Sequence, residues 1–310
     1  MKSPLLRPAL TLAALFVCFA LSAAETFRVA AYNVENYLDQ PTESRPKIKS
    51  AEAKAKVRET IRAMKPDVLV LEEMGGLSAL TELRDSLKAR RLHYPYMEHI
   101  TGYDTNIHVA VLSKFPFTAR RPHTNDTFLL SGRRFTVSRG LLEVDVQVNA
   151  NYSFTLLAAH LKSKRPIPDA DEEDLRLEEA KVLREKVDLR LAANLNANLI
   201  VLGDFNDTYD SKSTKAIIGR GKTKLVDTRP AERNGDNQPH PTNPHYFPRN
   251  VTWTHHFGAK DSYERFDYIL LSPGMANELV TGQTYIPTIP NWGIGSDHRP
   301  VLATFIAEDR

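Results

Sequence analysis

The sequence predicts an α/β fold with mixed β-sheets, because helix-like and strand-like segments alternate along the chain and one pair of strands forms a hairpin. Residues 142–148 alternate apolar and polar side chains, residues 149–151 form a turn, and residues 152–159 return as a second strand. The composition is that of a globular protein, with 42% hydrophobic and 25% charged residues among 310. A single doubly wound parallel sheet is not expected, since such a sheet contains no hairpin.

Residues 1–24 have the form of a secretory signal peptide. Lys2 and Arg7 precede an almost uninterrupted apolar run at 9–21, and the small residues at 22–24 suit cleavage. The apolar run is too short for the roughly 20 residues that span a bilayer, which argues against an uncleaved anchor. We therefore expect a protein that is secreted or periplasmic.

The mature chain is nearly neutral and contains no cysteine. Cleavage removes two of the 41 basic residues and the single cysteine, Cys18, which leaves 39 basic residues against 38 acidic ones. Without disulfides, the exported domain predicted over residues 25–310 has to be stable through its hydrophobic core alone. No global basic excess indicates a polyanionic partner, so any such attraction must be local. We expect a monomer with no stable protein partner.

The first third of the mature chain predicts strand, helix, strand and helix. Residues 27–31 are rich in strand-forming types. Apolar residues recur with the helical period over 50–64, and Pro66 separates that helix from the buried strand expected at 68–71. Leucines at helical spacing predict a second helix over 77–87.

The segments after the hairpin continue the alternation. Residues 172–194 place apolar side chains on one helical face, and residues 199–202 read as a buried strand. Five prolines among Asn, His and Gly predict a long irregular loop over 228–250. Residues 266–271 and 301–305 are the last two expected strands.

Side chains that can bind a metal or move a proton lie at the ends of these strands. They are Asn33, Glu72, Glu73, His160, Asp204, Asn206, Asp267, Asp297 and His298. Each alone also fits a structural role, such as a turn or a satisfied histidine. Together they predict one site, because strand ends at a shared edge bring distant residues together. Oxygen ligands without cysteine suit Mg²⁺, Mn²⁺ or Ca²⁺ better than structural zinc, and histidines suit proton transfer near neutral pH.

Seven motifs in order along the chain resemble those of the endonuclease/exonuclease/phosphatase superfamily. They are YNVEN at 32–36, PDVLVLEE at 66–73, VAVLSKFP at 109–116, AHLKS at 159–163, GDFND at 203–207, RFDYIL at 265–270 and SDHRPV at 296–301. The resemblance spans nearly the whole mature chain. It implies a four-layer α/β sandwich with two packed mixed β-sheets and a metal site at one edge.

The resemblance also implies roles for the predicted site residues. Glu73 matches the metal-binding glutamate, with Glu72 in the place usually held by glutamine, and Asn33 and Asp297 support the metal or the phosphate. Asp204 resembles the carboxylate that orients or deprotonates the attacking water, and Asn206 contacts the phosphoryl oxygen.

The two histidines complete the implied site. His298 resembles the imidazole that faces the scissile phosphate, whether as base, acid or charge stabiliser, and Asp267 holds a histidine or a second metal. His160 stands where secreted deoxyribonucleases and sphingomyelinases of this family have histidine and many abasic-site repair enzymes have tyrosine.

Four features lie outside this pattern or carry alternatives. Residues 102–108 lack the Arg-Gly pair that often precedes the third motif, which leaves no phosphate-binding arginine there. Lys162 could supply local positive charge for the substrate or belong to a solvated loop. Trp292 could stack on a base, touch a lipid head group or pack inside the protein. We expect no metal role for the histidines near the proline-rich loop, namely His240, His245, His255 and His256.

The sequence therefore predicts an exported phosphoesterase that uses Mg²⁺, or Mn²⁺ or Ca²⁺, and whose first-choice substrate is nucleic acid cut by an endonuclease activity. The alternatives are a phospholipid or sphingomyelin phosphodiesterase and an inositol or sugar phosphatase. The lipid alternative would favour an exposed apolar hairpin, and none is visible in the sequence. The alternative of another class is a non-catalytic binding protein on the same scaffold, which would be expected to have lost part of this residue set.

Overall fold

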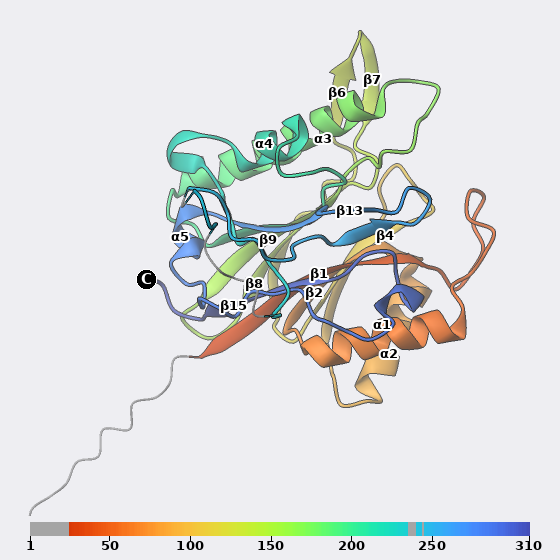
Figure 1. Ribbon diagram of the computed structural model, residues 1–310, viewed down its shortest axis with the longest axis horizontal. Helices are drawn as coiled ribbons and strands as arrows, with labels where there is room; N and C mark the ends of the chain where they lie inside the picture. The colour runs from red at the N-terminus through yellow and green to blue at the C-terminus, as the bar shows by residue number, and fades with distance from the viewer. Residues whose placement is uncertain (1–24, 235–239, 244) are drawn as a thin grey trace, which may run out of the picture.

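The computed structural model describes residues 25–234, 240–243 and 245–310 and shows four layers, with two β-sheets packed between two layers of helices (Figure 1). The predicted signal peptide lies outside the described residues. The fold is therefore the four-layer sandwich with two mixed sheets that the motifs imply.

The first sheet has five strands in the order β15-β1-β2-β4-β3. They are β1 (Thr26–Tyr37), β2 (Val68–Met74), β3 (Tyr96–Ile100), β4 (His108–Ser113) and β15 (Val301–Ile306). Strands β1 and β2 are parallel and the other pairs are antiparallel. Strand β1 extends well beyond the predicted residues 27–31, because it stays paired with β2 across a register shift between Asn33 and Tyr37.

The second sheet has six strands in the order β11-β14-β10-β9-β8-β5. They are β5 (Phe117–Arg120), β8 (Leu141–Gln147), β9 (Ser153–His160), β10 (Leu199–Asp204), β11 (Val226–Asp227) and β14 (Asp267–Leu271). Strands β8 and β9 form the predicted hairpin, whereas β9 and β10 are parallel. The sheet is mixed, as expected.

Side chains that alternate along each strand fill three cores. In β1, Phe27 and Val29 point between the two sheets, whereas Ala30 and Tyr32 point toward the helices α1 (Ala51–Met64) and α2 (Leu77–Lys88). A third core lies between the second sheet and the helices α3 (Glu172–Ala193) and α4 (Lys212–Ile218). Burial on both faces explains why the strands read as short apolar runs.

Local capping sets the boundaries of the predicted helices. The Ser50 hydroxyl accepts a hydrogen bond from the backbone N–H of Ala53 at the start of α1, and Lys65 ends that helix in the left-handed conformation before Pro66. The Asp171 carboxylate caps α3 in the same way, through the N–H groups of Glu173 and Asp174. The sequence therefore placed these helices within a residue or two.

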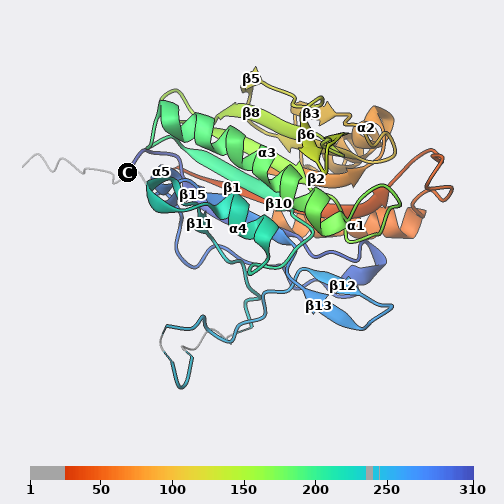
Figure 2. The ribbon, with the colours of Figure 1, turned by 90° about the horizontal axis from the view of Figure 1, so that it is seen from above.

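Two small hairpins escaped the sequence patterns. They are β6 (Thr127–Leu130) with β7 (Arg133–Thr136), and β12 (His255–Phe257) with β13 (Ser262–Glu264). Figure 1 shows the first projecting beyond the helix layer, and Figure 2 shows the second beside the loop that follows β11. Their strands are too short to show a clear period.

The predicted loop over 228–250 is irregular in its described part, which contains only an isolated bridge between Glu232 and Ile286. Three short helical segments complete the fold: α5 (Pro273–Ala276), η1 (Gly221–Thr223) and η2 (Trp292–Ile294). Among the helices described, none combines the length and the apolar character needed to cross a bilayer.

Candidate active site

Strand register in the second sheet places three predicted site residues in one row. Asp204 ends β10, and it pairs with His160 at the end of β9 and with Asp267 at the start of β14. All three side chains are almost fully buried. Because β9 and β10 are parallel and β14 is antiparallel to them, residues far apart in the sequence meet at one edge.

The first sheet contributes a matching pair. Asn33 of β1 lies opposite Glu72 of β2, and the Asn33 Nδ2 donates a hydrogen bond of 2.9 Å to Oδ2 of Asp204. This bond joins the two rows across the interface between the sheets. It spans 171 residues of sequence, so only the packing of the two sheets creates it.

Gly203 makes this close approach possible. Its φ angle is +128°, and a Cβ atom there would lie 2.1 Å from the carbonyl oxygen of Ala159 and 3.0 Å from Oε1 of Glu72. No side chain fits, which explains the glycine that precedes Asp204 in the fifth motif.

Four side chains converge on a single oxygen, Oδ2 of Asp204. Besides Asn33, the Nδ2 of Asn206 donates to it at 3.3 Å, and the Nε2 atoms of His160 and His298 lie 3.5 and 3.7 Å away. The other oxygen of Asp204 accepts from the backbone N–H of Asn206 at 2.8 Å. Asp204 is thus the centre of the predicted set.

His298 is fixed by the loop that precedes β15. The Ser296 hydroxyl donates to the Asn33 carbonyl oxygen at 2.7 Å and accepts from the His298 backbone N–H at 3.0 Å. The His298 Nδ1 lies 2.9 Å from Oδ2 of Asp267, which orients the ring and leaves Nε2 facing Asp204. The structure therefore brings Asp267 to a histidine, one of the two roles expected for it.

The charges of this pair depend on one another. Burial alone would lower the pKa of His298, but the carboxylates of Asp267 and Asp204 raise it well above the usual value for histidine. Burial raises the pKa of Asp204, and the nearby charge of His298 partly offsets that increase. A protonated His298 next to two buried carboxyl groups is the expected state at neutral pH.

His160 and Glu72 are expected to be neutral. Burial lowers the pKa of His160 well below its usual value, with a further contribution from the charge of Arg139. Burial raises the pKa of the Glu72 carboxyl well above its usual value, and Asp267 and Asp204 add to this increase. A neutral carboxyl group has the shape of an amide and can donate one hydrogen bond, so Glu72 can replace a glutamine there.

Glu73 lies at a break in the strand pairing of β2. Its φ angle of 60° and a register shift after Leu71 turn it out of the regular ladder. One oxygen of Glu73 accepts from Nδ2 of Asn33 at 3.3 Å, and the other accepts from the backbone N–H of Asn36 at 3.0 Å. Two of the predicted metal residues, Glu73 and Asn33, are therefore in direct contact.

The buried polar atoms around this edge fit a divalent cation. Both oxygens of Glu72 and Oδ1 of Asp267 lack a hydrogen-bond partner among the described residues. Ligand atoms of Asp204, Asp267 and His298 lie within 4.8 Å of one another, but a protonated His298 is no ligand, so the two carboxylates are the groups in this set that could hold an ion. Oxygen-rich sets of this kind suit hard cations.

Asp297, the third predicted metal residue, lies on the other side of His298. Burial alone would raise the pKa of Asp297, but contacts with His255 and the charge of His298 lower it. Its Oδ2 is 3.7 Å from Nε2 of His255. Burial lowers the pKa of Lys49, and the negative charges of Glu35, Glu73 and Asp297 partly offset that decrease.

Two side chains that are predicted to contact the substrate make hydrogen bonds within the protein. The Lys162 ammonium donates to the carbonyl oxygens of Ser163 and Arg165 at 3.1 and 2.8 Å, so it braces its own loop. The Asn206 amide donates to the carbonyl of Leu161 at 3.1 Å as well as to Asp204. Trp292 is partly exposed and stacks at a tilt on Trp253.

Sequence reasoning missed two arginines that supply positive charge beside His160. Arg139 is buried, donates to the carbonyl of Leu161 at 2.9 Å and lies 3.6 Å from Asp104. Arg45 donates to Oδ1 of Asn36 from the loop before α1. The charges of both arginines act on His160. Residues 102–108 contain no arginine, as noted from the sequence, and Arg139 comes from a different segment. No sequence motif marks it.

His255 is the third residue that the sequence did not place correctly. It lies in β12, outside the proline-rich loop, and pairs with His298 in an isolated bridge, with ring centroids 4.6 Å apart. Ligand atoms of His255, Asp297 and His298 also lie within 4.8 Å of one another. A strand of three residues gave no pattern by which to find it.

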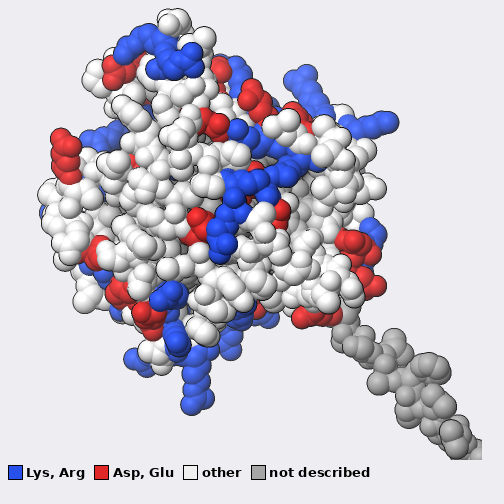
Figure 3. Space-filling view, turned by 180° about the vertical axis from the view of Figure 1, so that it is seen from behind, with Lys and Arg blue, Asp and Glu red and all other residues white. Residues whose placement is uncertain are grey.

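Charge on the far side of the protein is mixed. On the face seen in Figure 3, Lys and Arg side chains gather near the centre, and Asp and Glu side chains lie among them. Ion pairs such as that of Arg121 with Glu143 at 2.7 Å and that of Lys186 with Asp126 at 2.9 Å neutralise basic groups of the second sheet and its helix layer. This agrees with the near-neutral composition.

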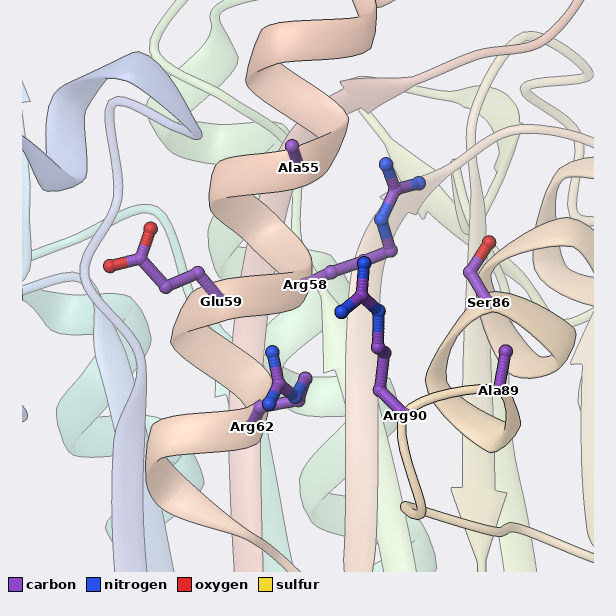
Figure 4. Close-up of a pocket in the computed structure, with 7 residues that line it drawn as sticks. All are labelled: Ala55, Arg58, Glu59, Arg62, Ser86, Ala89 and Arg90. Atoms are coloured by element: carbon purple, nitrogen blue, oxygen red, sulfur yellow. The ribbon is translucent and has the colours of Figure 1, made fainter.

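A hollow of about 380 Å³ between α1 and α2 contains none of the predicted site residues. Figure 4 shows three arginines extending over it: Arg58, Arg62 and Arg90. Arg58 is paired with Glu82 at 3.0 Å. The hollow lies on the helix layer of the first sheet, so it is separate from the edge that carries Asp204.

Comparisons with known proteins identify the family and the fold of the chain. The sequence model of a family described as "Endonuclease/Exonuclease/phosphatase family" matches residues 30–298, a range that contains every one of the predicted site residues. No curated protein sequence matches the chain significantly.

Solved structures show the same fold at low sequence identity. A truncated TDP2 from Caenorhabditis elegans is 18% identical, with a TM-score of 0.59 over 91% of this chain and 98% of the other. The human Nocturnin catalytic domain, solved with a bound sulfate anion, is 15% identical, with a TM-score of 0.63 over 90% and 94%. An endonuclease/exonuclease/phosphatase from Beutenbergia cavernae is 19% identical, with a TM-score of 0.58 over 91% and 72%.

Proposed function

Because this chain belongs to the endonuclease/exonuclease/phosphatase family, a family of phosphoesterases that generally use divalent metals, we propose that it is an exported, metal-dependent phosphodiesterase that hydrolyses nucleic acid. The observation that carries this proposal is the convergence of Asn33, His160, Asn206 and His298 on one oxygen of Asp204. A binding protein on the same scaffold would have no need to keep this buried and electrostatically costly arrangement.

The catalytic roles follow from the charges. Asp204, whose pKa is raised by burial, accepts the proton of the attacking water at Oδ2. His298, held protonated by Asp267, uses Nε2 to stabilise the negative charge that develops on the phosphoryl oxygens. The Asn33 side-chain amide donates hydrogen bonds to both Asp204 and Glu73 and so holds the two carboxylates near each other.

Glu73, Asn33 and Asp297 are the proposed metal residues. The ion, Mg²⁺ or alternatively Mn²⁺ or Ca²⁺, supplies charge neutralisation at the phosphate when it is bound. The unpartnered Oδ1 of Asp267 is a further oxygen ligand at the same edge, and Glu72 would add to it only on losing its proton.

Nucleic acid remains the proposed substrate for two reasons. The buried Arg139 guanidinium donates to the carbonyl of Leu161, directly after His160, and positive charge at that position suits a phosphodiester backbone. The human Nocturnin catalytic domain, which has the same fold, was solved with a bound sulfate anion, so this fold can accommodate a tetrahedral anion of the shape of a phosphate.

One observation favours a lipid phosphodiesterase as the second candidate. The projecting β6–β7 hairpin exposes 61% of Leu129, an apolar feature that the sequence did not reveal. It is a single aliphatic residue, however, and Arg133 and Arg134 follow on the paired strand. Membrane attachment normally requires a larger apolar surface.

The test is release of acid-soluble nucleotides from plasmid DNA by the mature protein. We expect cleavage with Mg²⁺, Mn²⁺ or Ca²⁺, and none with a chelator or in the His298→Ala variant. His93→Ala is the matched control, since His93 is exposed and its neighbour Tyr94 binds the Pro66 carbonyl before β2, at the end of that strand opposite Glu73. Hydrolysis of sphingomyelin without DNA cleavage would instead support the lipid candidate. If the protein hydrolyses no phosphate ester with any metal, the proposal that it is an enzyme is wrong.

A further inference from the structure

Two charged side chains of α3 are buried on the face of the helix that packs on the second sheet. Arg176 is 3% exposed and Glu179 is 1% exposed, and the same face carries the core residues Leu175, Ala180 and Leu183. Burying a charged group costs free energy, and apolar residues of similar volume often stabilise a core at least as well. Packing of the helix therefore does not by itself explain Arg176 and Glu179, here called the α3 polar pair.

Glu179 joins two segments that are separate in the sequence. One of its carboxylate oxygens accepts from the backbone N–H and from the hydroxyl of Ser138, at 2.8 and 2.6 Å. The other oxygen accepts from the backbone N–H of Lys162 at 2.7 Å. Ser138 directly precedes Arg139, and Lys162 is the second residue after His160. A single carboxylate thus holds the segment before β8 against the segment after β9.

Arg176 extends this connection to a third segment. Its Nη1 donates to the carbonyl oxygen of Lys162 at 3.1 Å, and its Nε donates to Oδ2 of Asp207 at 3.0 Å. The same oxygen of Asp207 accepts from the Ser213 hydroxyl at 2.8 Å. Because Asp207 directly follows Asn206, the α3 polar pair also fixes the segment after β10.

The backbone after His160 depends on these side chains. Strand β9 ends at His160, and the next carbonyl, that of Leu161, accepts from Nη1 of Arg139 at 2.9 Å and from Nδ2 of Asn206 at 3.1 Å. Both backbone groups of the following residue, Lys162, bond to the α3 polar pair. Buried backbone groups require such partners. The three segments are therefore connected through one short stretch of chain next to His160.

We propose that the α3 polar pair positions Arg139, His160 and Asn206 in the candidate active site and so contributes to catalysis without touching the substrate. This inference deepens the proposed function and rests on it. Hydrolysis depends on the orientation of the groups around the phosphate, and a misplacement of about 1 Å can cost roughly 10²-fold in rate. Arg176 and Glu179 are positioning residues in this sense, since they act through the three segments that they hold.

The first test is the Glu179→Gln variant, which keeps the shape of the side chain but replaces one acceptor oxygen with an NH₂ group. In either orientation that group faces a donor, from Ser138 or from Lys162, so one of the two segments is released. The substrate is bis(p-nitrophenyl) phosphate, with the divalent ion that best supports its hydrolysis by the unmodified protein. We expect kcat to fall about 10- to 100-fold and KM to change less than threefold.

Glu178→Gln is the matched control for this variant. Glu178 is the neighbouring residue on α3, and its carboxylate pairs with Lys181 at 2.6 Å. The same substitution there should change neither kcat nor KM. If Glu179→Gln does not fold, Ser138→Ala removes only the hydroxyl bond to Glu179 and should lower kcat about threefold.

A second pair of variants separates positioning from a purely structural role. Arg184 lies on the same helix but braces another part of the protein, because its Nη1 donates to the carbonyl oxygens of Ile217 and Ile218 at 3.1 Å. Arg176→Lys and Arg184→Lys each weaken such a brace, so both should lower the free energy of unfolding in urea. Only Arg176→Lys should lower kcat, by at least tenfold, when both variants are assayed without urea and fully folded.

The possible outcomes are distinguishable. If Glu179→Gln and Arg176→Lys lose stability but keep the kcat of the unmodified protein, the positioning role is overturned and the proposed phosphodiesterase stands. Equal losses of kcat in Arg176→Lys and Arg184→Lys would also overturn it, since any loosening of α3 would then have the same effect. No hydrolysis of the ester by the unmodified protein with any metal would reject the proposed function, and the positioning role with it.

Discussion

The Nδ1 atom of His298 lies 2.9 Å from Oδ2 of Asp267, although 31 residues separate them and both side chains are buried. Asp267 opens β14 in the second sheet, whereas His298 precedes β15 in the first. The pair therefore forms across the interface between the sheets. It fixes the ring orientation of His298 and stabilises its charged form.

The Asp267→Asn variant should reduce phosphodiester hydrolysis about 10²- to 10⁴-fold, the usual effect of removing one oriented catalytic group. The pKa of His298 should also fall, because burial lowers it once the carboxylate is gone. Imidazole chemical shifts measured against pH report that change directly. Asp85→Asn, on the exposed end of α2, should alter neither quantity.

The Glu73→Gln variant should bind Mn²⁺ at least tenfold more weakly in calorimetry of the unliganded protein. Loss of one carboxylate removes both a ligand and a negative charge from the proposed metal site. Glu59→Gln is the control, since Glu59 lies on α1 and pairs with Lys56 at 2.7 Å. Identical Mn²⁺ affinity in the two variants would show that Glu73 does not hold the ion.

The Gly203→Ala variant should lose about 2 to 4 kcal/mol of unfolding free energy, because its Cβ would lie 2.1 Å from a backbone oxygen that the sheet holds in place. Gly132→Ala separates this clash from backbone strain alone. Gly132 also has a positive φ angle, +76°, but has no atom within 4 Å of an added Cβ. It should lose only about 1 kcal/mol in urea unfolding. Equal losses of unfolding free energy in the two variants would mean that β9 and β10 can move apart to make room for the added Cβ.

The Glu278→Gln variant should become more stable than the unmodified protein as the pH rises. Burial raises the pKa of the Glu278 carboxyl to about 7, while the hydrogen bond from Tyr152 opposes that increase. The folded protein thus binds this proton more tightly than the unfolded chain does, so the contribution of Glu278 to stability is lost as pH rises from about 4.5 to about 7.

Glutamine carries no such proton. The unfolding free energy of the variant minus that of the unmodified protein should therefore be about 2 to 3 kcal/mol larger at pH 8 than at pH 5. Urea unfolding at the two pH values measures this difference. A difference that does not change with pH would show that Glu278 titrates normally.

Export should produce a mature chain that begins at Glu25. The apolar run before it has the length of a signal peptide, so Leu15→Arg should retain the precursor inside the cell. Intact mass of the protein in the periplasm and in the medium identifies both the cleavage site and the compartment. An uncleaved protein in the membrane fraction would instead indicate an anchor.

Most of the regular elements could be predicted from the sequence because their patterns are local. Apolar residues at helical spacing located α1 and α2, and alternation located the hairpin of β8 and β9. The end of β1 was placed too early, since its last residues are strand only through pairing with β2. The hairpin of β12 and β13 was missed for the same reason: short strands are stabilised by their contacts and not by their own pattern.

The site divides along the same line. Asp204, Asp267 and His298 could be identified from the sequence as polar groups at strand ends, because each stands next to an apolar run that is visible in its own segment. Arg139 and His255 had no such signal. They reach the site through a loop and a short strand whose positions depend on the whole fold.

The sequence by itself determined the mixed α/β class, the positions of the long elements and the residue types of the candidate site. Only the tertiary structure decided that Asn33 bonds Asp204, that His298 pairs with Asp267, and that Lys162 braces its own loop. The physical reason is that patterning and capping act over a few residues, whereas these contacts depend on how two sheets pack and on which edge their strand ends share.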